Sequence, residues 1–368
     1  MRLWSRTSIC TCATLAVLLI GISMAAADDA AIARARAALA AAKAAEDAAP
    51  TERNERAVDR ALAALNAALN ASALGRLTAS ANVGDTEPNN TPATATPLSF
   101  GLNPSATATA TIGVNGDVDY FSFTAPANAR IWAYVDTGGV QAGTSVDSLL
   151  QLIATDGTTQ LELDDSDGTG NGLDGTVETE SSSSIAGLLG PPAGGLIYAR
   201  ISEDGDNGTI NPMTLYVVTT TTSTPEVEGA GGNNSCATAN QLYSGVPHVG
   251  VRTGEIPAAT ADEDFYSVSA NSGDILYLAL DGDPERNGST DLELTLISTD
   301  GTTVLLAADS DNDSPLSEAF AFQVGTTGTF CVRVRDEPGG GVDTGTYAVM
   351  VANTSQFVPV ELQRFEVD

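Results

Sequence analysis

The chain has 368 residues, and its 47 acidic residues against 16 lysines and arginines give a net charge of −31. This length suits two or three domains of ordinary size, and the charge argues against nucleic acid or an anionic membrane surface as a partner. From residue 79 onward the chain contains 40 of the acids, seven arginines and no lysine. The sequence therefore predicts two physically different regions that join near residue 79.

Residues 1–27 have the order of a secretory signal peptide. Two arginines precede the apolar run 9–22, and the small residues 25–27 are followed by Asp28. The run is short for a membrane span, and no other long apolar stretch occurs, so we expect no span in the mature chain. These features predict a secreted protein, extracellular or at the cell surface, with the periplasm as the alternative.

Residues 28–78 are rich in alanine and predict a short α-helical segment. Pro50 and Thr51 divide this segment into two stretches. The second stretch has one apolar stripe, formed by Val58, Leu62, Leu65 and Leu69. A stalk or an oligomerisation element fits this pattern, and a partly ordered spacer is the alternative.

From about residue 82 the periodicity changes to short alternating runs separated by Gly, Asp, Asn and Pro. This pattern is typical of antiparallel strands in a sandwich. The pattern occurs twice, because "VDYFSF" (118–123) corresponds to "EDFYSV" (263–268) and "LIATDGTTQL" (152–161) to "LISTDGTTVL" (296–305). The sequence therefore indicates an internal duplication.

The predicted fold is mainly β, with two tandem antiparallel, jelly-roll-like β-sandwich domains after the helical segment. The domains are expected at 82–222 and 228–353, and residues 354–368 form a C-terminal tail. Each β region opens on a similar phrase, "GDTEPNNTPATATPL" (84–98) and "GAGGNNSCATANQL" (229–242).

The repeated pattern resembles the bacterial pre-peptidase C-terminal (PPC) domain. The resemblance rests on Glu-Pro-Asn-Asn, a later Asp-x-Asp-Tyr-Phe, a "TDG" hairpin, an Asp-rich loop and a closing Gly-x-Tyr strand. It covers both β regions but not residues 28–78, and the second copy lacks the Glu-Pro. The resemblance implies a secreted β-sandwich of the kind attached to extracellular peptidases and similar to clostridial collagen-binding modules.

The resemblance also implies a structural calcium ion in the first copy, held between the opening phrase and the Asp-x-Asp loop. The implied ligands are Asp85, Glu87, Asn89, Asn90, Asp117 and Asp119. Calcium takes six to eight oxygen ligands, and these side chains with carbonyls and water can supply them. The alternative is that the asparagines cap a turn and the aspartates are solvated.

In the second copy, an ungapped alignment places Gly229 and Gly231 opposite Asp85 and Glu87. We therefore expect a weaker site there, formed by Asn233, Asn234, Asp262 and Asp264. The Asp-rich loops, 167–178 in the first copy and Asp309, Asp311 and Asp313 in the second, are expected to be exposed turns, with weak calcium binding as the alternative.

After signal cleavage two cysteines remain, Cys236 and Cys331. An even pair in an exported protein favours a disulfide, with two buried free thiols as the alternative. Because Cys236 lies in the second opening phrase, we expect this bond to fix the segment that calcium fixes in the first copy.

No catalytic constellation is visible in the sequence. His248 is the only histidine, and the serine-hydrolase, zinc-protease and phosphate-loop motifs are absent.

The predicted function is a non-catalytic, calcium-stabilised binding or adhesion protein for an extracellular protein fibre or polysaccharide. Trp132 and Tyr134 are candidates for a binding face, or for the core. The alternatives are a structural cell-surface protein with a helical stalk, able to oligomerise through 28–78, and an accessory protein to a peptidase on another chain.

Overall fold

The fold is described from a computed structural model of the 368-residue chain. The described residues are 37–38, 41, 82–100, 104–138, 145–170, 173, 181–228, 232–243, 248–257, 262–286, 290–309, 317–336 and 344–354. Residues 37, 38 and 41 are helical, whereas the predicted signal peptide, the rest of 28–78 and residues 355–368 lie outside the described ranges. Residues 79–358 form one compact unit, within which the predicted domain limits stay a prediction.

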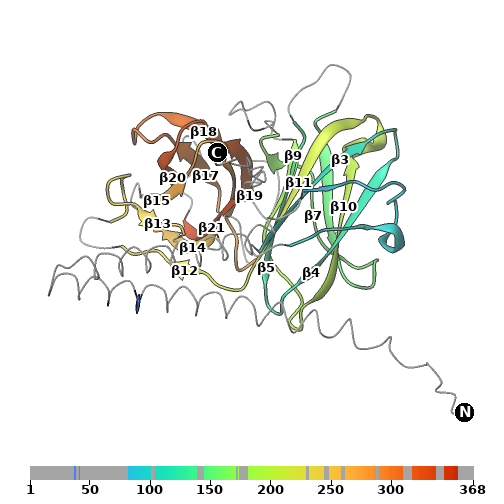
Figure 1. The fold of residues 1–368 in the computed structure, drawn as a ribbon, viewed down its shortest axis with the longest axis horizontal. Coiled ribbons are helices and arrows are strands. Elements are labelled where there is room, and N and C mark those ends of the chain that lie inside the picture. The colour runs from blue at the N-terminus through green and yellow to red at the C-terminus, as the bar shows by residue number, and fades with distance from the viewer. Residues whose placement is uncertain are drawn as a thin grey trace, which may run out of the picture. The chain divides into compact units, whose positions relative to one another are not determined.

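The described part of the chain is mainly β, as predicted (Figure 1). The first copy contains β1 (Asn82–Gly84), β2 (Thr96–Pro97), β3 (Ser105–Ile112), β4 (Val118–Ala125), β5 (Arg130–Asp136), β6 (Ser148–Ile153), β7 (Gln160–Asp164), β8 (Asp167–Gly168), β9 (Ser182–Leu189), β10 (Gly195–Glu203) and β11 (Ile210–Thr220). The second copy contains β12 (Thr224–Pro225), β13 (Asn240–Gln241), β14 (Val249–Ile256), β15 (Glu263–Ala270), β16 (Ile275–Asp281), β17 (Leu292–Ile297), β18 (Val304–Ala308), β19 (Ser317–Gln323), β20 (Gly328–Asp336) and β21 (Gly345–Asn353). Two short 3-10 helices, η1 (Pro92–Thr94) and η2 (Asp204–Asp206), lie in the first copy.

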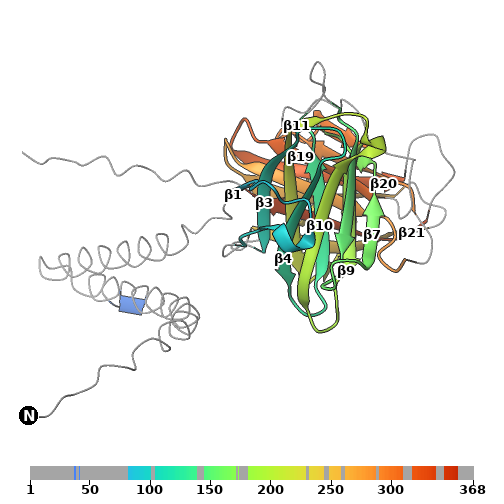
Figure 2. The same ribbon diagram turned by 90° about the vertical axis from the view of Figure 1, so that its right-hand side faces the viewer.

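Both copies build the same pair of sheets. One sheet has the order β2-β4-β10-β6-β7 in the first copy and β13-β15-β20-β17-β18 in the second. The other sheet of each copy is half of one 11-stranded sheet, with β1-β3-β11-β5-β9 from the first copy and β19-β16-β21-β14-β12 from the second. Figure 2 shows the strands of the first copy, coloured cyan to yellow-green, in their two layers.

The longer strands pair antiparallel, as predicted, but the short opening strands pair parallel. β1 joins β3 and β2 joins β4 in the first copy, and β12 joins β14 and β13 joins β15 in the second. β12 belongs to the second copy by this pairing although it precedes residue 228. Each opening segment (82–97 and 224–241) therefore begins at the edge of one sheet and ends at the edge of the other.

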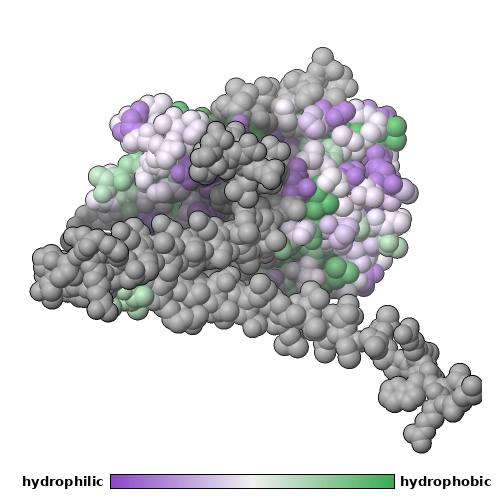
Figure 3. Space-filling model, in the orientation of Figure 1, coloured by the Kyte–Doolittle hydropathy of each residue, from purple (hydrophilic) through white to green (hydrophobic). Residues whose placement is uncertain are grey.

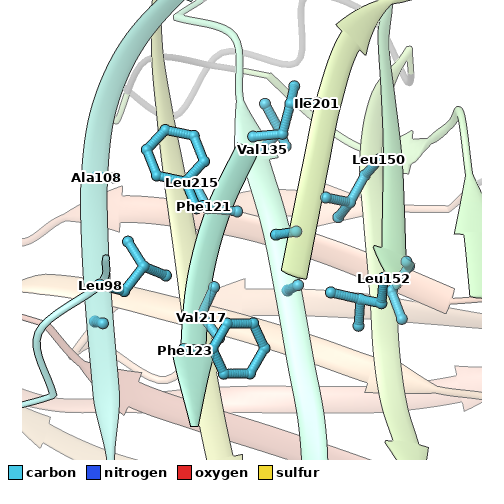
Figure 4. Packing of buried hydrophobic residues seen from close by; sticks show 14 of the residues in the cluster. Leu98, Ala108, Phe121, Phe123, Val135, Leu150, Leu152, Ile201, Leu215 and Val217 are labelled. Carbon is cyan, nitrogen blue, oxygen red and sulfur yellow. The ribbon is translucent and has the colours of Figure 1, made fainter. Parts of the chain in front are cut away.

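The first apolar core fills the space between the two sheets of the first copy. Alternate residues of β5 point into it, namely Ile131, Ala133 and Val135. Figure 4 shows inward-facing side chains of this core meeting between the layers, among them Val135 of β5 and Phe121 and Phe123 of β4. The second copy has a matching core of its own. These two cores follow from the alternation of apolar residues along each strand.

A third core lies between the two halves of the 11-stranded sheet. The first copy contributes bulky rings, Trp132, Tyr134 and Tyr216, all buried. The second copy contributes Tyr277, Met350 and Val251 together with several small residues, which are Ala279, Ala319, Ala321, Ala348 and Ala352. Large side chains against small ones allow the two layers to pack closely. Trp132 and Tyr134 are therefore core residues, the second of the two roles considered from the sequence.

A short strand of the first copy joins the two half-sheets. β8 follows β7 in the chain and pairs antiparallel with β9 and parallel with β19. The backbone N–H of Thr169 donates to the carbonyl of Ala319 at 3.1 Å, and that of Gln323 donates to the carbonyl of Leu173 at 3.1 Å. Asp167 is consequently buried, which corrects the expectation of an exposed turn at this position.

Charged side chains close the junction between the copies at its rim. Arg286 of the second copy contacts Asp281 at 2.8 Å and Glu162 of the first copy at 3.2 Å. Arg130 of the first copy donates to the carbonyl of Pro284 at 2.9 Å. Gly187 has φ +66°, and the Asp281 carboxylate occupies the space that its side chain would need. Burial raises the pKa of Asp281 to about 6, and Arg286 opposes this shift.

Large apolar side chains on the described surface are scattered. Figure 3 shows apolar residues interspersed among polar ones over the coloured part of the view. The exposed large residues are Val114, Leu163, Leu189, Val227 and Val304. Scattered residues of this kind do not form a binding patch. Among the described residues, no helix has the length and apolar character needed to cross a membrane.

Cys236 and Cys331 form a disulfide, which confirms the prediction from the sequence. Cys236 lies in the second opening segment and Cys331 in β20, where both pack against Phe265 and Ile297. The bond spans 95 residues, so it fixes the opening segment to the sheet across a long loop.

Removing this disulfide is expected to destabilise the second copy. The chain-entropy model gives an upper figure of about 4–5 kcal/mol for a loop of this length. The measurement is a thermal melt of C236S/C331S and wild type, each with and without reductant. Reductant should lower the melting temperature of wild type only, and an unchanged melting temperature of the variant under oxidising conditions would show that the bond contributes nothing.

Candidate metal centres

The first opening segment is held across one end of the first sandwich by backbone hydrogen bonds. The N–H of Asp85 donates to the carbonyl of Thr109 in β3 at 3.0 Å. The N–H of Tyr120 in β4 donates to the carbonyl of Asn89 at 3.0 Å. The segment therefore bridges the two sheets and places its acidic residues over the beginning of β4.

Asp119 points into the interior of the sandwich. It lies on the same face of β4 as Phe121 and Phe123, two residues of the first core, because side chains alternate along a strand. A polar residue at the end of an apolar row is thus fully buried. The strand register, rather than a loop, carries this carboxylate inside the fold.

Asp85, Glu87 and Asp119 form a compact acidic cluster. One carboxylate oxygen from each lies within 4.8 Å of the others. Oxygens bound to a single Ca²⁺ at 2.3–2.6 Å lie at most about 5 Å apart. The cluster therefore has the size and the donor type of a site for a hard cation.

Two side chains in this cluster have unused acceptor oxygens. Both carboxylate oxygens of Asp119 and the Oδ1 atom of Asn89 are buried and accept no hydrogen bond from the described residues. Asn89 is itself positioned by its other groups, since its Nδ2 donates to Asp85 at 2.5 Å and its N–H donates to Glu87 at 3.1 Å. A buried carboxylate without a partner is costly, and a bound cation would remove that cost.

Electrostatics point in the same direction. Burial, followed by the nearby charges of Asp85, Asp117 and Glu87, raises the pKa of Asp119 to about 8. Burial and the charge of Glu87 also raise the pKa of Asp85. Like charges are thus held together at a place where only a proton or a cation relieves their repulsion.

The other two predicted ligands, Asn90 and Asp117, are hydrogen-bonded to each other. Asn90 donates from Nδ2 to Asp117 at 2.9 Å, and Asp117 also accepts from the N–H of Gly113 at 2.9 Å. These bonds tie the opening segment to the turn before β4. The structure thus brings Asp85, Glu87 and Asp119 together with Asn89. The hydrogen bond between Asn90 and Asp117 holds the opening segment in place beside them.

The second copy contains an equivalent cluster, of which the sequence analysis included Asp264 but missed Glu226 and Glu228. Glu226, Glu228 and Asp264 offer oxygens that all lie within 4.8 Å of one another. The N–H of Glu226 donates to the carbonyl of Thr253 at 2.8 Å, as Asp85 does to Thr109. Glu226 and Glu228 therefore occupy the places of Asp85 and Glu87.

The alignment that placed Gly229 and Gly231 at these positions is corrected by this geometry. Three extra residues separate the second acid from the Asn-Asn pair in the second copy. The available signal was the spacing Glu-x-Glu at 226–228, which matches Asp-x-Glu at 85–87. An ungapped comparison could not find it, because the insertion shifts the acids out of register.

The predicted residues of the second site lie at this cluster. Asn233 accepts from the N–H of Phe265 at 2.8 Å through its carbonyl, and Asn234 donates to Asp262 at 2.9 Å. The Oδ1 atoms of Asn233 and Asp264 are buried without a hydrogen bond from the described residues. Burial raises the pKa of Asp264 to about 8, opposed by a hydrogen bond from Tyr347 and assisted by Glu226. Both clusters can thus hold a metal ion.

Two adjoining hollows lie on the surface of the same compact unit. Their volumes are about 510 and 430 Å³, and they share Gln241 and Tyr243. Among the described residues that line them, Arg252 is the charged one and none is an aspartate or glutamate; His248 lines the smaller hollow. Most are small or hydroxyl-bearing, including the run Thr219–Thr222. In a chain with so many acids, this acid-free lining is unusual.

Fold and sites together define a mainly β protein of two joined sandwiches, each with an acidic cluster that can hold a metal ion.

No protein-family model and no curated protein matches the chain. Solved structures similar to it include the g-type lysozyme inhibitor PliG of Aeromonas hydrophila, with 13% identity, 38% of this chain and 99% of that chain covered, and a TM-score of 0.24. PliG of Salmonella Typhimurium has 12% identity, coverages of 31% and 98%, and a TM-score of 0.22. The CUB1-EGF-CUB2 region of human MASP-1/3 has 11% identity, coverages of 68% and 100%, and a TM-score of 0.19. These similarities are too distant to assign a function.

Proposed function

We propose that this protein is an exported, non-catalytic binding protein made of two PPC-like sandwiches, with a structural calcium ion at the first cluster. The observation that carries the proposal is the buried carboxylate of Asp119, whose two oxygens accept no hydrogen bond from the described residues. Three carboxylates and an amide oxygen are hard donors that suit Ca²⁺. Binding modules that work outside cells hold calcium with dissociation constants of about 10⁻⁴–10⁻³ M, so the ion would be supplied by the medium.

Export is supported by two independent features. The first 27 residues have the order of a signal peptide, and the two remaining cysteines are joined in a disulfide, a bond typical of oxidising compartments. The acidic composition fits a soluble protein in a calcium-containing medium.

The acid-free hollows are the proposed ligand site, and a neutral polysaccharide is the proposed ligand. Hydroxyl and amide groups in the lining match the hydroxyl groups of a sugar chain, and the ring of Tyr243 offers an apolar face. The net charge of −31 would repel anionic polymers. No carboxylate of the lining has to lose its water when a neutral ligand enters, which favours binding.

A hydrolytic role is not proposed. His248 packs edge-on against Tyr243, with ring centroids 5.5 Å apart. A histidine base needs a nucleophile and an orienting acid, and the described lining of the hollows contains no acid. Both cysteines of the mature chain are in the disulfide.

Adding a negative charge to the hollow is expected to abolish polysaccharide binding. Thr222 is exposed and lines the larger hollow, so Thr222→Glu should place a carboxylate where the ligand lies. The assay is native gel electrophoresis of the mature chain in gels with β-glucan, xylan, dextran or glycogen, with gelatin as the protein-fibre probe. Wild type should be retarded by at least one polysaccharide, and Thr222→Glu should migrate freely.

Val304→Glu is the matched control, because Val304 is exposed on β18 and does not line either hollow. It adds the same charge and should bind as wild type. Retardation by gelatin alone would replace the polysaccharide with a protein ligand. No retardation by any probe, together with oligomers in sedimentation, would favour the structural cell-surface role instead.

A further inference from the structure

The second cluster contains two buried tyrosines that the first cluster lacks. Tyr347 donates from its hydroxyl to the Oδ2 atom of Asp264 at 2.5 Å. The hydroxyl of Tyr266 lies 2.5 Å from that of Tyr347 and 3.1 Å from Glu226. Two cluster carboxylates are therefore contacted by phenol groups from β15 and β21, below the opening segment.

The strand pairing shows what stands at the same places in the first copy. Tyr347 pairs with Gly254, and the corresponding pair of the first copy is Met213 with Ala110. Tyr266 pairs with Val332 on β20 as Phe121 pairs with Ala199 on β10. The first copy thus has no hydroxyl at either place.

Gly254 makes room for the phenol of Tyr347. A side chain at this position would overlap the Tyr347 ring and its hydroxyl, and would also meet Glu226. In the first copy an alanine is tolerated at the matching place, because methionine replaces the ring. Residues on β14, β15 and β21 thus all accommodate one buried pair of hydroxyl groups. This agreement argues that the pair has a specific role.

The two clusters consequently differ in what they leave unsatisfied. Both oxygens of Asp119 lack a partner among the described residues. Asp264 has one oxygen bonded to Tyr347 and one without a partner. A hydrogen bond to an ionised carboxylate is of the stronger kind, so the phenols already supply part of what a cation would supply.

We propose that the hydroxyl of Tyr347, supported by Tyr266, stabilises the buried carboxylate of the second cluster in part as a cation would. The second cluster then stays folded without a cation and binds one more weakly than the first cluster does. This inference rests on the proposed calcium function, and it assigns the tight structural ion to the cluster of Asp119. The tyrosines are positioning residues, since they act through the carboxylates.

The test is Tyr347→Phe in the full mature chain, melted in calcium chloride and in chelator. The phenylalanine keeps the ring and removes the donor. The loss of stability should be larger in chelator than in calcium, because the ion replaces the missing donor. By linkage, isothermal titration with calcium chloride should show the weaker class of sites tightened about tenfold.

Tyr277→Phe is the matched control. Tyr277 is fully buried in the core between the copies, and its hydroxyl has no hydrogen bond among the described residues. The change in melting temperature caused by Tyr277→Phe should be equal in calcium chloride and in chelator. Tyr266→Phe should resemble Tyr347→Phe with a smaller difference, and it serves as the second variant if Tyr347→Phe does not fold.

Equal losses for Tyr347→Phe in calcium and in chelator would overturn the inference. If wild type melts identically in both media, the calcium proposal fails on its own. In that case a calcium response that appears only in Tyr347→Phe would still support the role of the phenol, and the lack of any response would reject it.

Discussion

Removal of calcium is expected to lower the melting temperature of the chain of residues 28–368 by about 5–10 °C. A ligand present at 100 times its dissociation constant stabilises the folded state by about 2.7 kcal/mol, and one kcal/mol shifts the melting temperature of a unit of this size by about 2–4 °C. The physical reason is the trio Asp85, Glu87 and Asp119, whose like charges are held together around a buried carboxylate. The measurement is calorimetry in calcium chloride and in chelator.

Asp119→Asn is the decisive variant for this prediction. The amide keeps the size of the side chain but removes the charge, so it should stabilise the cation-free protein and remove most of the response to calcium. Asp156→Asn is the control, because Asp156 is an exposed turn residue of the same sandwich whose carboxylate bonds to Thr159. It should leave the calcium response unchanged. A calcium response of wild-type size in Asp119→Asn would exclude the first cluster as the site.

Truncating a ring in the core between the copies is expected to destabilise the whole unit of residues 79–358. Tyr134 is fully buried and stacks on Tyr277 of the second copy, with ring centroids 5.7 Å apart. Replacing a large buried aromatic side chain by alanine costs about 3–5 kcal/mol. Tyr134→Ala should therefore lower the melting temperature by about 10 °C.

Two probes make this test specific. Trp132 lies in the same core and is the only tryptophan after residue 4, so its fluorescence reports the contact between the copies, while circular dichroism reports all the strands. In wild type both signals should change at one temperature. Tyr198→Ala, on the outward face of β10, is the control and should cost less. Equal losses for the two variants would mean that the shared core does not hold the copies together.

Several features of the fold could be predicted from the sequence because they are local. Alternating apolar residues and turn residues indicate strands, and the repeated phrases indicate the duplication. The structure confirms the mainly β fold and the disulfide between Cys236 and Cys331. The inward position of Asp119 could also be predicted from the sequence, because an acid two residues before Phe121 in a strand lies on the same face as Phe121.

Other features depend on contacts between segments that are distant in the sequence. Glu226 was missed because an insertion shifts it out of register in an ungapped comparison, and its bond to Thr253 in the folded chain shows that it stands in the place of Asp85. The hydrogen bond between Asn90 and Asp117 depends on the path of the opening segment across the sandwich. Sequence spacing cannot distinguish a ligand from a neighbour that positions it.

The sequence by itself determined the strands, the duplication and the acidic residues from which a cation site can be built. Only the tertiary structure decided that the two sandwiches share a core and a sheet, because the outward face of β5 becomes buried only when the second copy covers it. The tertiary structure also decided how the two clusters differ, since Tyr347 reaches Asp264 across 83 residues of chain. Burial and long-range contact are properties of the folded chain, and no local pattern contains them.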